Sequence, residues 1–201
     1  MPRYEEIRDQ FKTGDIILFS GKGAFSSMIK LFSGGKWSHI GMVIRLPDFD
    51  DAVLLWESTT LTNTSDVEFN SSIKGVQLVA LSERISRYAG EISLRPLNKP
   101  INESMYSDLS QLRHKLSRRP YERDELELLR SAWDGIAGAN SEDLSSVFCS
   151  ELVAEAYQSM GLLPEPPVGL PSNEYTPLDF SEARELKLQG DYRLKREISI
   201  T

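Results

Sequence analysis

Cysteine and histidine are scarce in this 201-residue sequence, which has one cysteine, Cys149, and two histidines, His39 and His114. A single cysteine cannot form a disulfide within the chain, so we expect a reducing, cytoplasmic location. One cysteine and two histidines are also too few for the usual Cys/His zinc cluster. We therefore predict neither a structural metal nor another cofactor.

Long apolar segments and an excess of positive charge are missing as well. The apolar runs, such as 16–19 and 53–56, are far too short to span a bilayer, and the charged N-terminal segment lacks the apolar core of a secretory signal. Lys and Arg number 23 against 30 Asp and Glu, which gives a net charge of -7 and a pI near 5.0. Because phosphate binding needs a basic surface, we expect no nucleic-acid partner.

What is present is an ordinary globular composition. The chain is 40% hydrophobic and 26% charged, and no repeat or long linker divides it, so residues 1–201 are predicted to form a single domain. Apolar, β-branched runs predict strands at 15–20, 37–44, 52–58, 75–81, 91–97 and 192–200. Helical spacing predicts helices at 3–12, 103–119 and 122–134, a helical turn at 24–33, and a helix from Cys149 onward. The expected loops are 59–74, 135–146 and the proline-rich 164–177.

Cys149 lies where an amphipathic helix is predicted to begin. Gly161 and Pro164 stop this helix, and serines just upstream of the cysteine are candidate N-caps (Ser145, Ser146). Unpaired N–H groups and the macrodipole at a helix N-terminus favour negative charge, and therefore the thiolate, which is the nucleophilic form of cysteine. The alternative is a buried, unreactive thiol, because free cysteine is among the most buried residue types.

His39 and Glu57 are predicted to lie on the two strands of a hairpin. Folding the chain about Asp48 places His39 nine residues before the centre of the turn and Glu57 nine residues after it. Residues directly opposite in an antiparallel pair project to the same face with Cβ atoms about 5 Å apart. The Glu57 carboxylate is therefore expected to orient and charge-stabilise the His39 imidazole. The alternative is an exposed His–Glu pair on a sheet surface, although Glu57 follows the strongly apolar run 53–56.

Cys149, His39 and Glu57 together have the chemistry of a nucleophilic site. A thiol needs a base to become a nucleophile, and the base needs a third group that orients it. His114 is a weaker candidate for the base, because it lies opposite the apolar stripe of the 103–119 helix and is expected to be solvated. The cysteine comes last along the chain, but geometry rather than order defines such a site.

Six segments, taken in order, resemble one protein family. They are Gly14-Asp15-Ile16-Ile17, Trp37-Ser38-His39-Ile40-Gly41, Trp56-Glu57-Ser58, Pro120-Tyr121-Glu122, Phe148-Cys149-Ser150-Glu151-Leu152-Val153 and Tyr175-Thr176-Pro177. From about residue 13 to about residue 180, the chain resembles the YiiX/YebB-like group, a circularly permuted, papain-like branch of the NlpC superfamily. The resemblance implies an α+β fold in which a small antiparallel sheet packs against helices and the nucleophile cysteine lies at a helix N-terminus.

The resemblance also implies a cysteine hydrolase that cleaves an amide or ester bond through a covalent acyl-enzyme intermediate. Cys149 would be the nucleophile, His39 the general base and then acid, and Glu57 the orienting residue. The backbone N–H of Cys149 would be one donor to the oxyanion, as is usual in papain-like sites.

The substrate is expected to be a small molecule, a peptide or a lipid. Trp37, Ser38 and Ser150 are the residues predicted to bind it, and the loops 59–74 and 135–146 are expected to border the pocket. Because no export signal is predicted, a peptidoglycan substrate is not expected.

Two other functions stay open. An acyltransferase of the lecithin:retinol acyltransferase type typically carries Asn-Cys-Glu-His, where this chain has Phe148-Cys149-Ser150-Glu151. A non-catalytic binding module would retain the fold without the reaction, and the presence of all three candidate residues argues against it.

Overall fold

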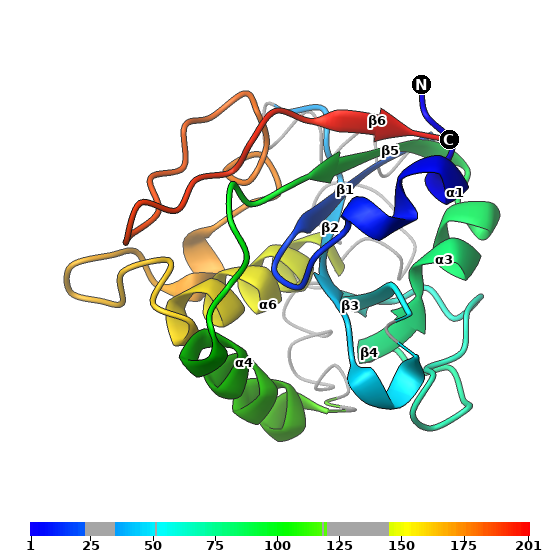
Figure 1. The fold of residues 1–201 in the computed structure, drawn as a ribbon, viewed down its shortest axis with the longest axis horizontal. Coiled ribbons are helices and arrows are strands. Elements are labelled where there is room, and N and C mark those ends of the chain that lie inside the picture. Colours follow the sequence, from blue (N-terminus) through cyan, green and yellow to red (C-terminus); the bar gives the residue numbers. More distant parts are fainter. Residues whose placement is uncertain (23–34, 51, 118, 120–144) are drawn as a thin grey trace, which may run out of the picture.

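The computed structural model describes residues 1–22, 35–50, 52–117, 119 and 145–201. Within these residues, strands form one six-stranded antiparallel sheet with the spatial order β4-β3-β2-β1-β5-β6 (Figure 1). The strands are Ile16–Gly21 (β1), His39–Ile44 (β2), Leu54–Thr59 (β3), Gly75–Ala80 (β4), Gly90–Arg95 (β5) and Ile198–Ile200 (β6). Each predicted strand is present, and the last is confined to the end of the predicted range 192–200.

The described α-helices range in length from 4 to 15 residues. They are Tyr4–Ile7 (α1), Leu81–Arg87 (α3), Glu103–Leu116 (α4) and Ser145–Ser159 (α6), with 3-10 turns at Arg8–Gln10, Pro47–Phe49 and Ser172–Glu174. Helix α3 is not among the predicted helices, because its 7 residues are too few to show a clear helical period. The predicted helical turn 24–33, the predicted helix 122–134 and most of the predicted loop 135–146 lie outside the described residues.

Alternate residues of the strands pack into two separate hydrophobic cores, one on each face of the sheet. The first core joins α4 and α6 to strand residues such as Ile16, Leu18, Ile40, Met42 and Trp56. The second joins α1 and α3 to Ile17, Phe19, Val43, Leu55 and Val79. Helices therefore cover both faces (Figure 1), which explains why the central strands are buried along their whole length. The α+β class predicted from the sequence is confirmed.

The register between β2 and β3 differs from the predicted one. The observed pairs place Glu57 opposite Gly41 rather than opposite His39, which makes His39 and Glu57 diagonal neighbours (Met42↔Trp56, Val43↔Leu55, Ile44↔Leu54). The difference is two residues, and side chains alternate with a period of two, so both side chains still project from the same face.

The connection between these strands explains the shift in register. It is not a symmetric turn about Asp48, because a 3-10 turn at Pro47–Phe49 is followed by Asp50 in the left-handed conformation, with φ 51. The prediction of a direct cross-strand pair is therefore wrong, while the prediction of a shared face is confirmed.

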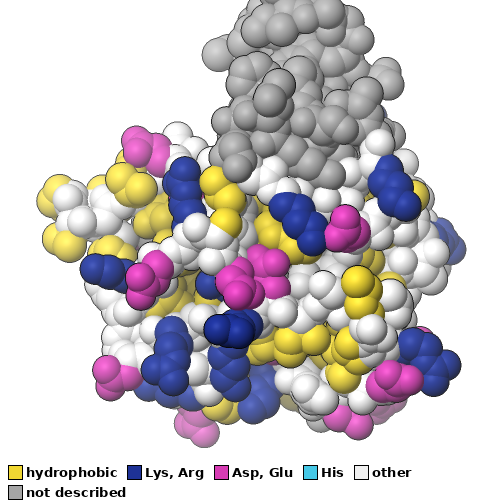
Figure 2. Space-filling view, turned by 90° about the horizontal axis from the view of Figure 1, so that it is seen from above, with side chains coloured by type: hydrophobic (Ala, Val, Ile, Leu, Met, Phe, Trp, Pro, Cys, Tyr) yellow, Lys and Arg dark blue, Asp and Glu magenta, His cyan; other side chains and the backbone are white. Residues whose placement is uncertain are grey.

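The surface carries both signs of charge. On the face seen in Figure 2, Lys and Arg side chains are interspersed with Asp and Glu side chains. Among the residues that the structure describes, no helix has the length and apolar character needed to cross a membrane.

Candidate functional site

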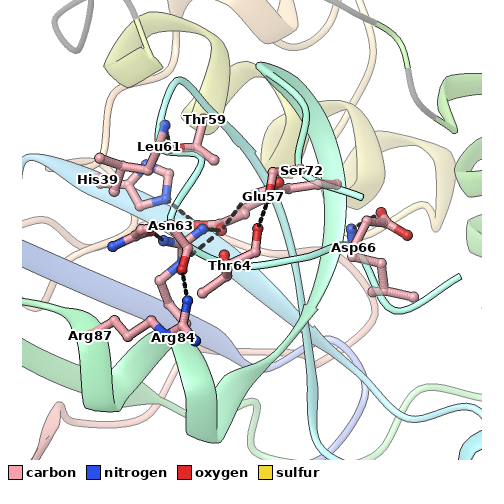
Figure 3. A network of polar contacts seen from close by, with 12 residues as sticks. His39, Glu57, Thr59, Leu61, Asn63, Thr64, Asp66, Ser72, Arg84 and Arg87 are labelled. Carbon is pink, nitrogen blue, oxygen red and sulfur yellow. Dashed lines mark hydrogen bonds and ion pairs between the residues drawn. The ribbon is translucent and has the colours of Figure 1, made fainter. Parts of the chain in front are cut away.

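Glu57 is the centre of a buried polar network (Figure 3). Its side chain has no solvent exposure, and its two oxygens have different partners. Oε2 lies 2.6 Å from Nε2 of His39. Oε1 accepts hydrogen bonds from Nε of Arg84 at 2.9 Å, from Nη2 of the same arginine, and from Nε2 of Gln77 at 3.2 Å. One oxygen therefore serves the imidazole, and the other is held by β4 and α3.

Glu57 is ionised despite its burial. Burial acts to raise the pKa of this carboxyl, but the positive charge of Arg84 and the hydrogen bond with His39 act in the opposite direction and lower it to about 2. A carboxylate without solvent in this position would otherwise be strongly disfavoured. The network thus supplies a permanent negative charge beside the His39 ring.

His39 lies between this carboxylate and the thiol of Cys149. Burial acts to lower the pKa of His39, but the charge of Cys149 and a hydrogen bond with its side chain raise it, as do the hydrogen bond with Glu57 and its charge, to about 9. Nε2 is bound to Glu57, and Nδ1 has no nitrogen or oxygen partner among the described residues. The ring nitrogen available to the sulfur is therefore Nδ1.

The three residues come from different parts of the fold. His39 is the first residue of β2, so its ring lies at the end of the sheet, and Glu57 is in β3. Cys149 is on α6, which packs against β2 and β3 from the face of the first core. The structure thus brings together the residues that the sequence analysis groups as Cys149, His39 and Glu57.

Cys149 is fully buried, with 0% exposure, and belongs to the first core. It also lies deeper in its helix than predicted. Because α6 begins at Ser145, Cys149 is in the second turn, where the N–H of residue i pairs with the carbonyl of residue i−4. In a regular helix the backbone N–H of Cys149 would then pair with the carbonyl of residue 145, and its predicted role as an oxyanion donor stays a prediction. The macrodipole also acts mainly within the first turn.

Arg84 joins the carboxylate to the loop that follows β3. Its side chain is 1% exposed, and Nη1 donates to Oδ1 of Asn63 at 2.6 Å. Arg87 donates to the backbone carbonyl of the same asparagine (Figure 3). Arg84 was not among the predicted site residues, although one signal was present in the sequence. It follows Leu81 by three residues, so an arginine lies on the apolar face of a short helix.

Asp66 organises the rest of the 59–74 loop. Its Oδ1 accepts from the N–H groups of Glu68 at 2.9 Å and Phe69 at 3.1 Å, and its Oδ2 accepts from the N–H of Leu78 at 2.8 Å. A buried aspartate with three backbone donors fixes this loop against β4. The predicted loop is therefore ordered beside the polar network.

The three predicted substrate-binding residues lie in the packed interior. Trp37 is buried, and its indole N–H donates to Oε1 of Glu197 at 3.0 Å. The Ser38 hydroxyl donates to the carbonyl of Phe19 at 3.3 Å and accepts from the N–H of Gly21 at 3.2 Å. The Ser150 hydroxyl donates to the carbonyl of Tyr175 at 2.6 Å. Each of these side chains makes a hydrogen bond within the fold, and their predicted role in substrate binding stays a prediction.

Tyr88, the C-cap residue of α3, is a further neighbour that the sequence analysis missed. Its ring contacts Phe19 at a centroid distance of 4.9 Å, and Phe19 contacts the His39 ring at 5.4 Å. Burial raises the pKa of Tyr88 to about 12, although a hydrogen bond with Ser38 acts to lower it. A neutral phenol and the imidazole therefore contact the same Phe19 ring. His114, in contrast, is exposed on α4, as predicted.

Comparison with known proteins finds a distant sequence match and a similar fold. No family model matches the chain. It is 29% identical over 166 residues to an uncharacterised protein of Acanthamoeba polyphaga mimivirus, and the match covers 74% of this chain and 63% of the viral protein. The chain thus spans less than two thirds of that relative's length. Among solved structures, its fold is similar to that of the metalloprotein YiiX from Escherichia coli O157:H7, with a TM-score of 0.50, 20% identity, and coverage of 75% of this chain and 67% of the other.

YiiX is described as a metalloprotein, so the fit of a metal to the present site is relevant. Within the described residues, no group of three or more His, Cys, Asp or Glu side chains is placed to hold a metal ion. Both oxygens of Glu57 are engaged, and a cation there would face the guanidinium of Arg84. The residues that the structure describes at this site do not fit a metal.

Proposed function

We propose that this protein is a cysteine hydrolase of the permuted papain-like type, which cleaves an amide or ester bond through a thioester on Cys149. The observation that carries the proposal is the buried His39–Glu57 pair, whose Nε2 and Oε2 atoms lie 2.6 Å apart, beside a thiol whose charge raises the pKa of the same imidazole. The similarity of the fold to YiiX and the sequence resemblance to the YiiX/YebB-like group support it.

In the proposed reaction, the sulfur of Cys149 forms a bond to the substrate carbonyl carbon, and the thiol proton is held on Nδ1 of His39. The imidazolium gives this proton to the leaving amine or alkoxide as the C–N or C–O bond breaks, which leaves a thioester. Neutral His39 then takes a proton from water, whose oxygen attacks the thioester carbonyl. The acid product leaves, and the sulfur departs as thiolate. Glu57 stays ionised throughout and orients the ring through Nε2.

The full burial of the thiol favours the second candidate, a non-catalytic module in which Cys149 is a core residue. Alkylation separates the two functions. Because Cys149 is the single cysteine, any label taken up from iodoacetamide reports on it alone. The hydrolase predicts faster labelling of the native protein at pH 6 than of the same chain unfolded in guanidinium, since only the native thiol has an imidazole beside it. Slower labelling of the native protein would favour the module.

The reaction itself is tested with a panel of acyl esters, thioesters, lipid esters and short peptides. The hydrolase predicts an acyl adduct on Cys149 in mass spectrometry and release of free acid, both absent in Cys149→Ala and His39→Ala. His114→Ala is the matched control, because this histidine is exposed on α4. Turnover that persists in Cys149→Ala would exclude the proposed reaction, and transfer to an added amine or alcohol without free acid would indicate an acyltransferase instead.

A further inference from the structure

Arg84 is a buried cation, and among its described contacts Glu57 is the one anionic partner. Its guanidinium binds Oε1 of Glu57 through Nε and Nη2 and binds Oδ1 of Asn63 through Nη1. A guanidinium at 1% exposure is costly unless its donors are satisfied and its charge is balanced. Its position is therefore fixed tightly relative to the carboxylate.

The way in which Arg84 binds Glu57 differs from an ordinary structural ion pair in the same protein. Arg113 of α4 is also buried, and its Nη1 lies 2.8 and 2.7 Å from the two oxygens of Glu68. A single arginine therefore binds both oxygens of that carboxylate. Arg84 instead binds Oε1 only. The second oxygen of Glu57 remains available for His39, at 2.6 Å.

The charges along this series alternate in sign. Arg84 is positive, Glu57 negative, protonated His39 positive, and a Cys149 thiolate would be negative. Arg84 thereby offsets the buried carboxylate, which a low-dielectric interior would otherwise favour in its neutral form. If Glu57 were neutral, the imidazolium would lose its anionic partner on the Nε2 side.

We propose that Arg84 is a positioning residue for the Cys149–His39 pair, because it holds Oε1 of Glu57 so that an ionised Oε2 faces Nε2 of His39. This assignment rests on the proposed function and adds a fourth residue, from α3 on the opposite face of the sheet to α6. The Cys149 thiol and its base are then supported by both helical layers of the fold.

The test measures the imidazole directly, without a substrate. The chain has two histidines, so 15N-detected NMR of the ring nitrogens shows His39 and, as an internal reference, exposed His114. Spectra are recorded between pH 4 and pH 10 for the wild type, Arg84→Met and Arg84→Lys. Arg113→Met is the matched control, because it removes a buried arginine that binds a glutamate away from His39. Iodoacetamide labelling is measured on the same four proteins.

In Arg84→Met, the Nε2 resonance of His39 should show a new inflection between pH 4 and pH 7 as Glu57 takes up a proton, and labelling at pH 6 should slow by about tenfold or more. Arg84→Lys retains the charge but loses the second donor, so it should show a smaller change in both measurements. His114 should not change in any variant, and Arg113→Met should match the wild type in the His39 profile.

Two results would overturn the assignment. One is an Arg84→Met protein with native spectra whose His39 profile overlays that of the wild type. If that variant does not fold, an Arg84→Lys protein whose His39 profile and labelling rate equal those of the wild type has the same meaning. Failure of the proposed function is distinct, because it appears in the wild type itself as labelling slower than that of the unfolded chain.

Discussion

Gly41 of β2 lies opposite Glu57 of β3, and its missing side chain leaves room for the glutamate. A Cβ added at Gly41 would lie 3.2 Å from Cβ of Glu57 and 2.7 Å from Cδ1 of Leu55. The carboxylate can therefore extend diagonally past Gly41 to His39. A glycine within the strand is explained here by a close side-chain approach rather than by a turn.

Gly41→Ala should displace Glu57 and Leu55, because both neighbours are buried and have little room to move. We expect a loss of roughly 1–3 kcal/mol in the free energy of unfolding, which urea denaturation measures, together with slower labelling of Cys149. Gly161→Ala is the control: an added Cβ there meets nothing within 4 Å, but φ of +67 makes it strained, so it should lose stability without slower labelling. Equal labelling in Gly41→Ala and the wild type would contradict the argument.

Glu57→Gln keeps the shape of the side chain and removes its charge. Arg84 is then buried without an anion, and we expect the free energy of unfolding to fall by roughly 3–5 kcal/mol. The pKa of His39 should fall below its native value of about 9, because Glu57 contributes to raising it. Chemical denaturation and NMR titration of the ring check the two effects. If the pKa of His39 does not move in a folded Glu57→Gln protein, the carboxylate does not act on the imidazole as described.

Stability should depend on pH above neutrality through His39. Its pKa is raised from 6.5 to about 9 in the folded protein, so the folded state binds the proton more tightly than the unfolded state. This contribution, on the order of 1–3 kcal/mol, is fully present below pH 6.5 and is lost as the pH rises through about 9. Urea denaturation of the wild type between pH 6 and pH 10 should show the loss, whereas His39→Gln should give a flatter profile. Parallel profiles would refute the assignment to His39.

At acidic pH, Glu57 should have the opposite effect. Its pKa is lowered from 4.5 to about 2, so the stability it contributes is present above 4.5 and is lost as the pH falls toward 2. The wild type should therefore lose more stability than Glu57→Gln between pH 5 and pH 3 in the same denaturation measurement. A steeper loss in Glu57→Gln would show that other carboxyl groups control acid unfolding.

Asp66→Ala should loosen the 59–74 loop, because three backbone N–H groups lose their acceptor. We expect a loss of roughly 2–4 kcal/mol, with faster amide hydrogen exchange confined to residues 61–74 and 78. Asp66→Asn keeps one acceptor oxygen and should have a smaller effect. Uniformly faster exchange across the sheet would instead indicate that Asp66 supports the whole fold rather than this loop.

Part of the site follows from local sequence. The apolar, β-branched runs predict the strands, and their alternation places His39 and Glu57 on one face, so an error of two residues in register left this conclusion intact. The candidate nucleophile and base also follow from the sequence, because it has a single cysteine and only one of its two histidines, His39, lies outside the predicted helices.

The tertiary structure alone decided what surrounds these residues. Arg84 reaches Glu57 from a helix that is too short to be predicted. The side chains of Trp37, Ser38 and Ser150 are buried and form hydrogen bonds in the interior. Cys149 lies in the second turn of α6. Periodicity and alternation describe how a segment relates to its own neighbours. They carry no information about which distant side chain will meet a buried charge, because that depends on how the two helical layers pack across the sheet.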